Sequence, residues 1–337
     1  MADAKVLIVD DVESNLFVVR KLMLSYGLTV DTATSGQEAI ERIKGGGAYD
    51  IVFMDHMMPE MDGIEAAKKI REMGIETPII ALTANDAEGS REMFLAEGLN
   101  EMLSKPVNKA ALEKILADWI KPGNAGAARN DAPAESGAGT ALWKKIEQIP
   151  GLSVQIGLDR VSGQRDVYEK LLKLTVREFD NHLHNLNNFL AAGDLKGFSI
   201  EVHGLKSALA NIGVMELSAR ARELEDASGG GDAAFCTENL PRFLEGLGSL
   251  NTSLVGIFSE DAASRGPVEL PPELPKIFDR LKAAFEKNDF AAIDDGMESL
   301  NALNSAGALK AEIDKINEAV LMIDYDGALN VMRKLLA

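Results

Sequence analysis

The sequence predicts an α/β domain with a doubly wound parallel sheet, followed by domains that are entirely helical. Four short apolar runs alternate with amphipathic stretches in the first 106 residues, which is typical of buried strands joined by helices. A stretch rich in Ala, Gly and Pro separates this part from a remainder whose apolar residues recur at helical spacing. These observations predict an α/β plus all-α chain, and a length of 337 residues allows two or three domains.

The four apolar runs end on polar residues of different kinds. The runs cover residues 6–11, 50–55, 78–83 and 101–106. The polar residues at their ends are Asp10, Asp11, Asp55, Thr83 and Lys105. Because parallel strands open the same ends onto one edge of a sheet, we expect these side chains to converge there. Three crowded carboxylates need a compensating cation, and their oxygen ligands suit Mg²⁺, so we expect a metal site. A carboxylate beside this metal and Lys105 could accept a phosphoryl group.

The first domain resembles a receiver, or response regulator, domain. The resemblance rests on the Asp10-Asp11 pair, the run from Met54 to Gly63 (MDHMMPEMDG), the Thr83-Ala84 pair and the Lys105-Pro106 pair. It implies that Asp55 is the phosphoacceptor, with Mg²⁺ held by Asp10, Asp11, Asp55 and the backbone carbonyl of Met57. Thr83 would be the switch hydroxyl and Lys105 the phosphate-binding cation. The resemblance also implies the strand order 2-1-3-4-5 and a cis peptide bond at Lys105-Pro106.

Two residues near this site depart from the receiver pattern or invite another role. Met102 stands three residues before Lys105, where receivers usually carry Tyr or Phe, and a thioether couples less directionally to Thr83. We therefore expect weaker or differently built signalling through the face of the fourth helix, fifth strand and fifth helix. His56 follows Asp55 directly, and alternation along a strand predicts that its side chain points away and is structural.

Composition argues against several classes of protein. The net charge is −18 and there is no basic run, so we expect no nucleic-acid partner and no anionic membrane surface. No apolar stretch approaches the length of a membrane span, and the first run is too short for a signal peptide. Cys236 is the single cysteine, which excludes an internal disulfide and favours a cytoplasmic protein. The oligomeric state stays open.

Shifts in composition predict the domain boundaries. We expect the receiver domain at 1–121, a flexible linker at 122–139, a helical domain at 140–260 and a C-terminal helical module at 268–337. A linker of this length and composition keeps neighbouring domains within reach of one another. Met1 stands directly before the first strand, which argues against a detached tail of a hybrid kinase.

A histidine and a lysine one turn apart stand out in the helical part. Apolar spacing predicts a helix over 166–190, and residues 194–226 continue the pattern. The buried stripe of this second stretch leaves His203 and Lys206 on a shared, more exposed edge. Because a neighbouring cation offsets the charge of a phosphoryl group on an imidazole, the pair is suited to phosphoryl chemistry.

Residues 140–257 resemble a histidine-containing phosphotransfer (HPt) domain. The resemblance rests on the segments Gly157 to Val161 and Tyr168 to Leu172, and on His203, Leu205, Lys206, Asn211, Ile212 and Gly213. It implies that His203 carries the phosphoryl group, whereas His182 and His184 lack this context and are assigned to packing or the surface. Ser207 stands where the family usually has Gly, so it would either narrow access for an incoming receiver or hydrogen-bond the imidazole.

The last seventy residues predict a third helical unit. We expect three helices, and two of their joints, at Asp289-Phe290 and Asp324-Tyr325, repeat at an offset of 35 residues. A similar joint, Asp194-Leu195, precedes His203. A capped helix hairpin explains the pattern, and the alternative is a degenerate HPt-like bundle with Glu298 in place of the histidine. Its apolar face would serve as a lid on the active helix or as a docking face for a partner.

Together these features predict a phosphoryl carrier in a two-component phosphorelay. Asp55 would accept phosphate and His203 would carry or exchange it, with a histidine kinase, other receiver domains, or both as partners. No nucleotide-binding glycine box or P-loop is present, so we expect a carrier protein without an ATP-binding kinase domain, and not an enzyme. The alternative is a regulated adaptor or phosphate sink, in which phosphorylated Asp55 controls access to His203 or partner binding by the C-terminal helices. The direction of flow, and whether transfer is intramolecular, stay open.

Overall fold

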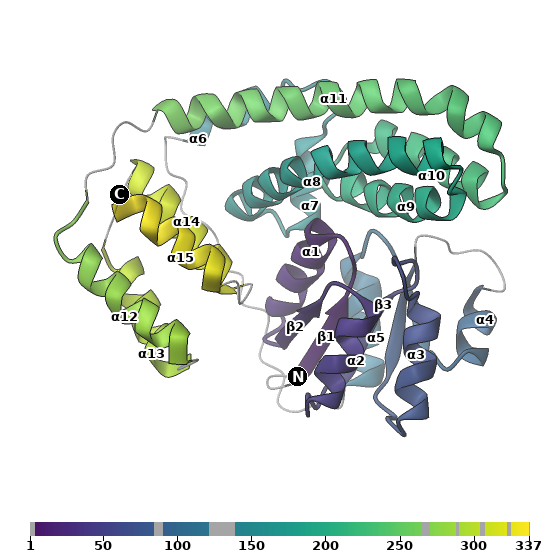
Figure 1. The fold of residues 1–337 in the computed structure, drawn as a ribbon, viewed down its shortest axis with the longest axis horizontal. Helices are drawn as coiled ribbons and strands as arrows, with labels where there is room; N and C mark the ends of the chain where they lie inside the picture. The colour runs from purple at the N-terminus through teal and green to yellow at the C-terminus, as the bar shows by residue number, and fades with distance from the viewer. Residues whose placement is uncertain are drawn as a thin grey trace. The chain divides into compact units, whose positions relative to one another are not determined.

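The computed structural model describes residues 4–83, 90–120, 139–264, 270–287, 290–303, 307–321 and 325–336. The chain divides into two units, Met1–Ile257 and Phe258–Ala337. The first unit contains an α/β domain and a helical bundle, and the second is helical (Figure 1). The predicted linker, 122–139, lies outside the described residues except for Gly139.

Five parallel strands form the sheet of the α/β domain, in the order β2-β1-β3-β4-β5. They are β1 (Lys5–Val9), β2 (Thr29–Ala33), β3 (Ile51–Asp55), β4 (Ile79–Thr83) and β5 (Glu101–Ser104). The four predicted strands and the strand order are confirmed. Strand β2 is not apparent as an apolar run, because it lies at the edge of the sheet and its sequence, TVDTA, is largely polar.

Helices cover both faces of this sheet. They are α1 (Glu13–Leu24), α2 (Gly36–Lys44), α3 (Gly63–Glu72), α4 (Ser90–Ala96) and α5 (Lys109–Trp119). On one face, α1 and α5 share a core with Val6 and Ile8 of β1. On the other face, α2, α3 and α4 pack with Leu7 and Val9. Since successive side chains point to opposite faces and both faces are buried, the central strands β1, β3 and β4 are apolar over most of their length.

Four helices close a bundle in the rest of the first unit. They are α8 (Arg165–Ala192), α9 (Leu195–Asn211), α10 (Met215–Gly229) and α11 (Ala233–Ser264), preceded by the short helices α6 (Gly139–Ile146) and α7 (Val154–Arg160). Cys236 of α11 lies buried against the carbonyl of Leu224 in α10. Asn251 of α11 donates to Asp180 of α8 at 3.3 Å, so the last helix returns to the first. The expected four-helix bundle is confirmed.

The stretch predicted to continue as helix over 194–226 contains two helices, because the chain turns after Asn211. Gly213 has a φ of +83°, a backbone conformation that L side chains rarely adopt. The hydroxyl of Tyr168 in α8 donates to the carbonyl of Ile212 at 2.7 Å. The Asn211-Ile212-Gly213 motif therefore ends α9 and ties this end to α8.

The described residues from 270 onward contain four helices, so the prediction of three is wrong. They are α12 (Leu274–Lys287), α13 (Phe290–Asn301), α14 (Gly307–Leu321) and α15 (Tyr325–Leu336), and they share one apolar core. The break between α13 and α14 escapes prediction because residues 302–306 (ALNSA) contain no Gly or Pro. Core residues recur at the predicted offset of 35, as Leu281 with Ile316 and Met297 with Met332.

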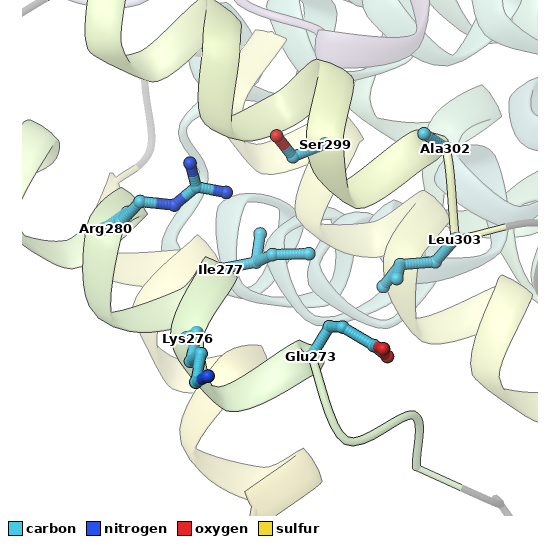
Figure 2. A pocket seen from close by; sticks show the side chains of 7 residues that line it. All are labelled: Glu273, Lys276, Ile277, Arg280, Ser299, Ala302 and Leu303. Atoms are coloured by element: carbon cyan, nitrogen blue, oxygen red, sulfur yellow. The ribbon is translucent and has the colours of Figure 1, made fainter.

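A hollow of about 510 Å³ opens on the second unit, beside α12 and the end of α13. In Figure 2, the side chains of Arg280 and Ile277 approach it from α12 and Ser299 approaches it from α13. None of the residues predicted for phosphoryl chemistry lines this hollow. The candidate site therefore lies in the first unit.

No helix in the described ranges combines the length and the apolar character needed to cross a bilayer. The single cysteine is buried and free.

Replacing Gly213 by alanine should destabilise the bundle more than replacing Gly151. Both glycines have positive φ values, +83° and +79°, so each variant incurs backbone strain of about 1–2 kcal/mol. A Cβ at position 213 would also lie 2.3 Å from the carbonyl oxygen of Ser153, whereas one at 151 has nothing within 4 Å. Denaturant unfolding measures the difference, and equal midpoints would contradict the position of α9 against Ser153.

Candidate functional site

Three carboxylates converge at the carboxyl-terminal edge of the sheet, as predicted. Asp10 and Asp11 follow β1, and Asp55 is the last residue of β3. Ligand oxygens of the three side chains lie within 4.8 Å of one another. Asp10 and Asp55 are 1% and 0% exposed, so water screens their charges very little. The backbone N–H of Val12 donates to Asp10 Oδ1 at 3.0 Å and holds this carboxylate in place.

The predicted lysine and threonine lie at the same edge. Lys105 Nζ donates to Asp10 Oδ2 at 2.8 Å and to Asp55 Oδ2 at 2.7 Å. The peptide bond from Lys105 to Pro106 is cis, as expected. Thr83 ends β4, the neighbour of β3, and is 1% exposed. The fold thus brings together the five polar residues at four strand ends that the sequence singles out.

This pocket holds more negative charge than Lys105 balances. Burial, together with the charges of Asp10 and Asp55, raises the pKa of Asp11 to about 8. Burial also raises the pKa of Asp10, although Lys105 acts in the opposite direction. For Asp55 burial raises the pKa, but Lys105 and His203 together outweigh burial, and the pKa is lowered. A further cation would relieve the remaining excess of negative charge.

The donor set fits the Mg²⁺ ion predicted from the sequence. Asp10, Asp11 and Asp55 each offer a carboxylate oxygen to one point, and hard oxygen ligands are those that Mg²⁺ prefers. Met57 follows closely in the loop after β3, where its backbone N–H lies 3.5 Å from Asp55 Oδ1. The role of the Met57 carbonyl as a further ligand stays a prediction.

His203 lies against this pocket and not on an exposed edge, so the prediction of its exposure is wrong. Its side chain is 1% exposed, and its Nε2 lies 3.8 Å from Asp55 Oδ1. The spacing of apolar residues along α9 identifies the face that packs inside the bundle. This spacing carries no information about the receiver domain, which covers the face of α9 that points away from the interior of the bundle. Lys206, expected on the same exposed edge, has a side chain that is only 12% exposed.

Glu225 of α10 orients His203 and is not apparent from the sequence. Its Oε1 lies 2.6 Å from His203 Nδ1, and its Oε2 accepts from Lys206 Nζ. Burial has the largest single effect and raises the pKa of Glu225, but the hydrogen bonds and charges of His203 and Lys206 together outweigh it and bring the pKa to about 2. Since this ionised carboxylate only accepts, Nδ1 carries the hydrogen, and in the neutral ring Nε2 holds the lone pair. No local motif marks Glu225, because it lies 22 residues from His203 on the next helix.

The two carboxylates beside His203 also act on its charge. Burial lowers the pKa of His203, but the nearby Asp55 carboxylate and the hydrogen bond to Glu225 together outweigh burial and raise it. For Lys206 burial dominates and lowers the pKa, against the attraction of Glu225. The ammonium of Lys206 therefore pairs with Glu225. The sequence predicts Lys206 beside the imidazole and does not include Glu225.

His56 belongs to the site as well, although the sequence predicts that it points away. Its ring packs edge-on against His203 with centroids 5.3 Å apart, and against Phe94 of α4 at 5.7 Å. Its Nδ1 lies 3.3 Å from the carbonyl oxygen of Leu82. Burial, followed by the charge of His203, lowers the pKa of His56 to about 4. The alternation rule fails because β3 ends at Asp55, so His56 is already a loop residue.

The other residues noted in the sequence have structural surroundings. Ser207 is 2% exposed, and its hydroxyl has no hydrogen-bond partner among the described residues, so a bond to the imidazole is not formed. His182 Nδ1 lies 2.5 Å from Glu201 Oε1, which agrees with a packing role between α8 and α9. Met102 packs against the core under α2, α3 and α4.

Known families match both halves of the site. The response regulator receiver domain family matches residues 6–117, and the Hpt domain family matches residues 170–252. Two-component response regulator 24 of Arabidopsis thaliana is 40% identical over 118 residues, which are 34% of this chain and 85% of that protein. Sensor protein GacS of Pseudomonas syringae pv. syringae is 26% identical over 261 residues, 76% of this chain. The receiver domain of Francisella response regulator 1452 has 32% identity and a TM-score of 0.32, covering 34% of this chain and 95% of that one.

The matched ranges contain the residues that meet in the structure. The receiver match includes the acidic pocket and Lys105, and the Hpt match includes His203 and Glu225. The chain spans 85% of the plant regulator's length but only 27% of the GacS sensor's length. The chain therefore belongs to the two-component signalling proteins, as a response regulator receiver domain followed by an Hpt domain, the pair of domains that makes a phosphorelay carrier.

Proposed function

We propose that this chain carries a phosphoryl group on Asp55 and on His203 and transfers it between them within one molecule. The observation that carries the proposal is the distance of 3.8 Å between His203 Nε2 and Asp55 Oδ1, with both side chains 1% exposed. The two acceptors face one another in a place that excludes water, which protects an acyl phosphate from hydrolysis. The two family matches, together with the GacS sensor that aligns over 76% of this chain, favour this carrier over an adaptor or phosphate sink.

Transfer from Asp55 to His203 needs one bond to form and one to break. The lone pair of His203 Nε2 attacks phosphorus on the side opposite the Asp55 oxygen. As the N–P bond forms, the bond between phosphorus and that oxygen breaks, and Asp55 returns as a carboxylate. Attack needs the neutral ring, so the proton that the raised pKa of His203 favours on Nε2 must first pass to solvent. In the transfer step itself no proton moves, because Nδ1 keeps its hydrogen and shares it with Glu225. The reverse transfer uses the same atoms, with Asp55 as the nucleophile.

Charge in the pocket favours the transferring group. Lys105, which contacts both Asp10 and Asp55, offsets negative charge on the phosphoryl oxygens. Thr83 supplies a hydroxyl from the neighbouring strand. Mg²⁺ held by the acidic pocket would add positive charge to the same oxygens. Lys206 neutralises Glu225 and so lets that carboxylate lie beside the imidazole.

A close backbone approach brings the two domains together. Val12 is the N-cap residue of α1, and Gly204 follows His203 on α9. A Cβ at position 204 would lie 2.6 Å from Val12 Cγ2, the one atom within 4 Å that the described residues place there outside α9. The absence of a side chain at Gly204 therefore sets how closely His203 approaches Asp55.

Glu178 of α8 makes a second contact, at the start of α1. Val12 offers no side-chain acceptor for the first turn of α1, and the Ser14 N–H donates to Glu178 Oε1 at 3.0 Å. The free N–H groups and the dipole of a helix N-terminus attract a carboxylate. The other oxygen, Oε2, is buried without a hydrogen-bond partner among the described residues. Burial consequently dominates over the bond from Ser14 and raises the pKa of Glu178.

Exchange with other proteins requires the two domains to separate. While α9 faces the receiver domain, His203 is 1% exposed and out of reach of an outside acceptor. A histidine kinase that supplies Asp55, or another receiver that takes the group from His203, would bind once the contact opens. The chain would act as a carrier between these partners, without a kinase activity of its own.

Acetyl phosphate and Mg²⁺ should label the full-length protein first on Asp55 and then on His203. His203→Gln should keep the aspartyl phosphate and lose phosphohistidine, whereas Asp55→Asn should lose both. Because the transfer is intramolecular, its rate constant should not change with protein concentration in a rapid-quench experiment. A rate proportional to concentration would contradict the proposal. His182→Gln, which alters a histidine paired with Glu201 on neighbouring helices, is the matched control and should behave as wild type.

Gly204→Ala should slow this transfer by roughly tenfold or more, because an overpacked contact costs on the order of 1–3 kcal/mol. Val12→Ala removes the Cγ2 that the new methyl group meets, so the double variant should recover the rate. Gly248→Ala in α11 has nothing within 4 Å of the added Cβ and serves as a control for the change in helix propensity. A double variant that stays as slow as Gly204→Ala would argue against this docking contact.

Glu178→Gln should strengthen docking at neutral pH and have much less effect near pH 4.5, the ordinary pKa of a glutamate. We attribute the burial that raises the pKa of Glu178 to docking. The docked form is then most stable below the undocked pKa and loses stability as pH rises toward the docked pKa. Glutamine still accepts from Ser14 but carries no charge. Hydrogen exchange of the Ser14 amide, corrected for its intrinsic rate, reports docking. Lower protection in the variant at neutral pH would refute this explanation.

A further inference from the structure

Two asparagine side chains connect the Hpt bundle to the acidic pocket. Asn211 Nδ2 in α9 donates to Asn15 Oδ1 in α1 at 3.0 Å. Asn15 Nδ2 in turn donates to Asp10 Oδ1 at 3.2 Å. The three side chains are 4%, 2% and 1% exposed, in that order along the path. A buried path of hydrogen bonds therefore runs from the end of α9 to a carboxylate of the predicted metal site.

The chemistry of the three groups determines the direction of both amides. Asp10 already accepts hydrogen bonds from Val12 and Lys105, and an ionised carboxylate has only acceptors. Asn15 must therefore present its NH₂ group to Asp10, which leaves its oxygen toward the bundle. Only a donor satisfies that oxygen, and Asn211 supplies its own NH₂ group. Each amide orientation depends on the next one along the path.

The side-chain hydrogen bond of Asn211 is made to the receiver domain and not to its own bundle. Its Oδ1 is buried without a hydrogen-bond partner among the described residues. A buried polar atom in this condition costs on the order of 1–3 kcal/mol. Ser207, one turn earlier on the same face of α9, likewise has an unpartnered hydroxyl. Burying these polar atoms without partners costs the bundle stability. The hydrogen bond from Asn211 to Asn15 of the receiver domain is the interaction that Asn211 gains in return.

We propose that Asn211 and Asn15 couple docking of the Hpt bundle to Mg²⁺ binding by the receiver domain. In the docked arrangement Asn211 orients the Asn15 amide, and Asn15 holds the Asp10 carboxylate in the direction of the acidic pocket. When the bundle leaves, the Asn15 oxygen turns to water and Asp10 loses this support. Mg²⁺ affinity is then higher in the docked arrangement, and Mg²⁺ by the same factor favours docking.

This coupling rests on the docked arrangement in the proposed function but not on the transfer step itself. The coupling would favour Mg²⁺ binding in the acidic pocket when His203 faces Asp55. In this arrangement the positive charge of Mg²⁺ would assist transfer. The coupling would also weaken metal binding when the domains separate. The coupling is therefore tested without any phosphoryl donor.

Titration calorimetry of the full-length protein with Mg²⁺ measures the effect of Asn211. Asn211→Asp has the same shape but sets an acceptor against the acceptor of Asn15, and Asn211→Ala removes the donor without adding charge. Both should weaken Mg²⁺ binding by up to about tenfold, the lower end of the range for groups that orient metal ligands. Asn187→Asp adds the same charge at an exposed position of α8 and should leave the affinity unchanged. Wild-type affinity in both Asn211 variants would overturn the coupling.

A second arm alters docking and leaves both amides in place. Gly204→Ala should weaken Mg²⁺ binding by a similar factor, and Mg²⁺ should raise the protection of the Ser14 amide in the wild type but not in Asn211→Ala. If Gly204→Ala loses Ser14 protection yet binds Mg²⁺ like the wild type, the effect of Asn211 is local and the coupling is refuted. Loss of phosphohistidine formation with the Mg²⁺ linkage intact would refute the proposed transfer alone.

Discussion

Negative charge at the edge of the receiver sheet is the constraint on which the arrangement of the first unit depends. Three carboxylates meet there in a place that water barely reaches, and Lys105 is shared between two of them. Groups that donate hydrogen bonds or carry positive charge gather around this excess: the backbone of Val12, the amide of Asn15 and the imidazole of His203. Because the last of these belongs to the Hpt bundle, the same charge that would bind Mg²⁺ also attracts the phosphoryl acceptor.

Burial of His203 links chemistry to domain movement. An imidazole between Glu225 and Asp55 has a defined tautomer and a defined direction, which a surface histidine lacks. The same burial closes it to other proteins. A relay that requires both intramolecular transfer and outside partners must therefore alternate between a docked and an open arrangement. The contacts at Gly204, Glu178 and Asn211 each join single side chains or backbone groups, which suits an equilibrium that a ligand or a phosphoryl group shifts by a few kcal/mol.

The second unit repeats one helix hairpin. The two hairpins contribute equivalent residues to one core, and Phe285 stacks on Tyr325 with ring centroids 4.7 Å apart. Asn301 and Asn317 exchange hydrogen bonds between α13 and α14. Glu298, the residue at the position expected for a histidine, is exposed on α13. This repetition agrees with packed hairpins, and the HPt-like alternative stays a prediction.

The sequence by itself determined four of the five receiver strands and the acidic pocket, because each of the four is a local apolar run and parallel strands place their ends at one edge. The strand order followed from the resemblance to receiver domains. The sequence also identified His203, through a motif carried on one helix. Only the tertiary structure decided what surrounds His203. Glu225 lies on another helix, His56 lies just beyond the end of its strand, and Asn15 pairs with a residue 196 positions away. The spacing of apolar residues indicates which face of a helix is buried inside its own domain but not what covers the other face. The contact between Asp55 and His203 therefore cannot be predicted from either segment alone.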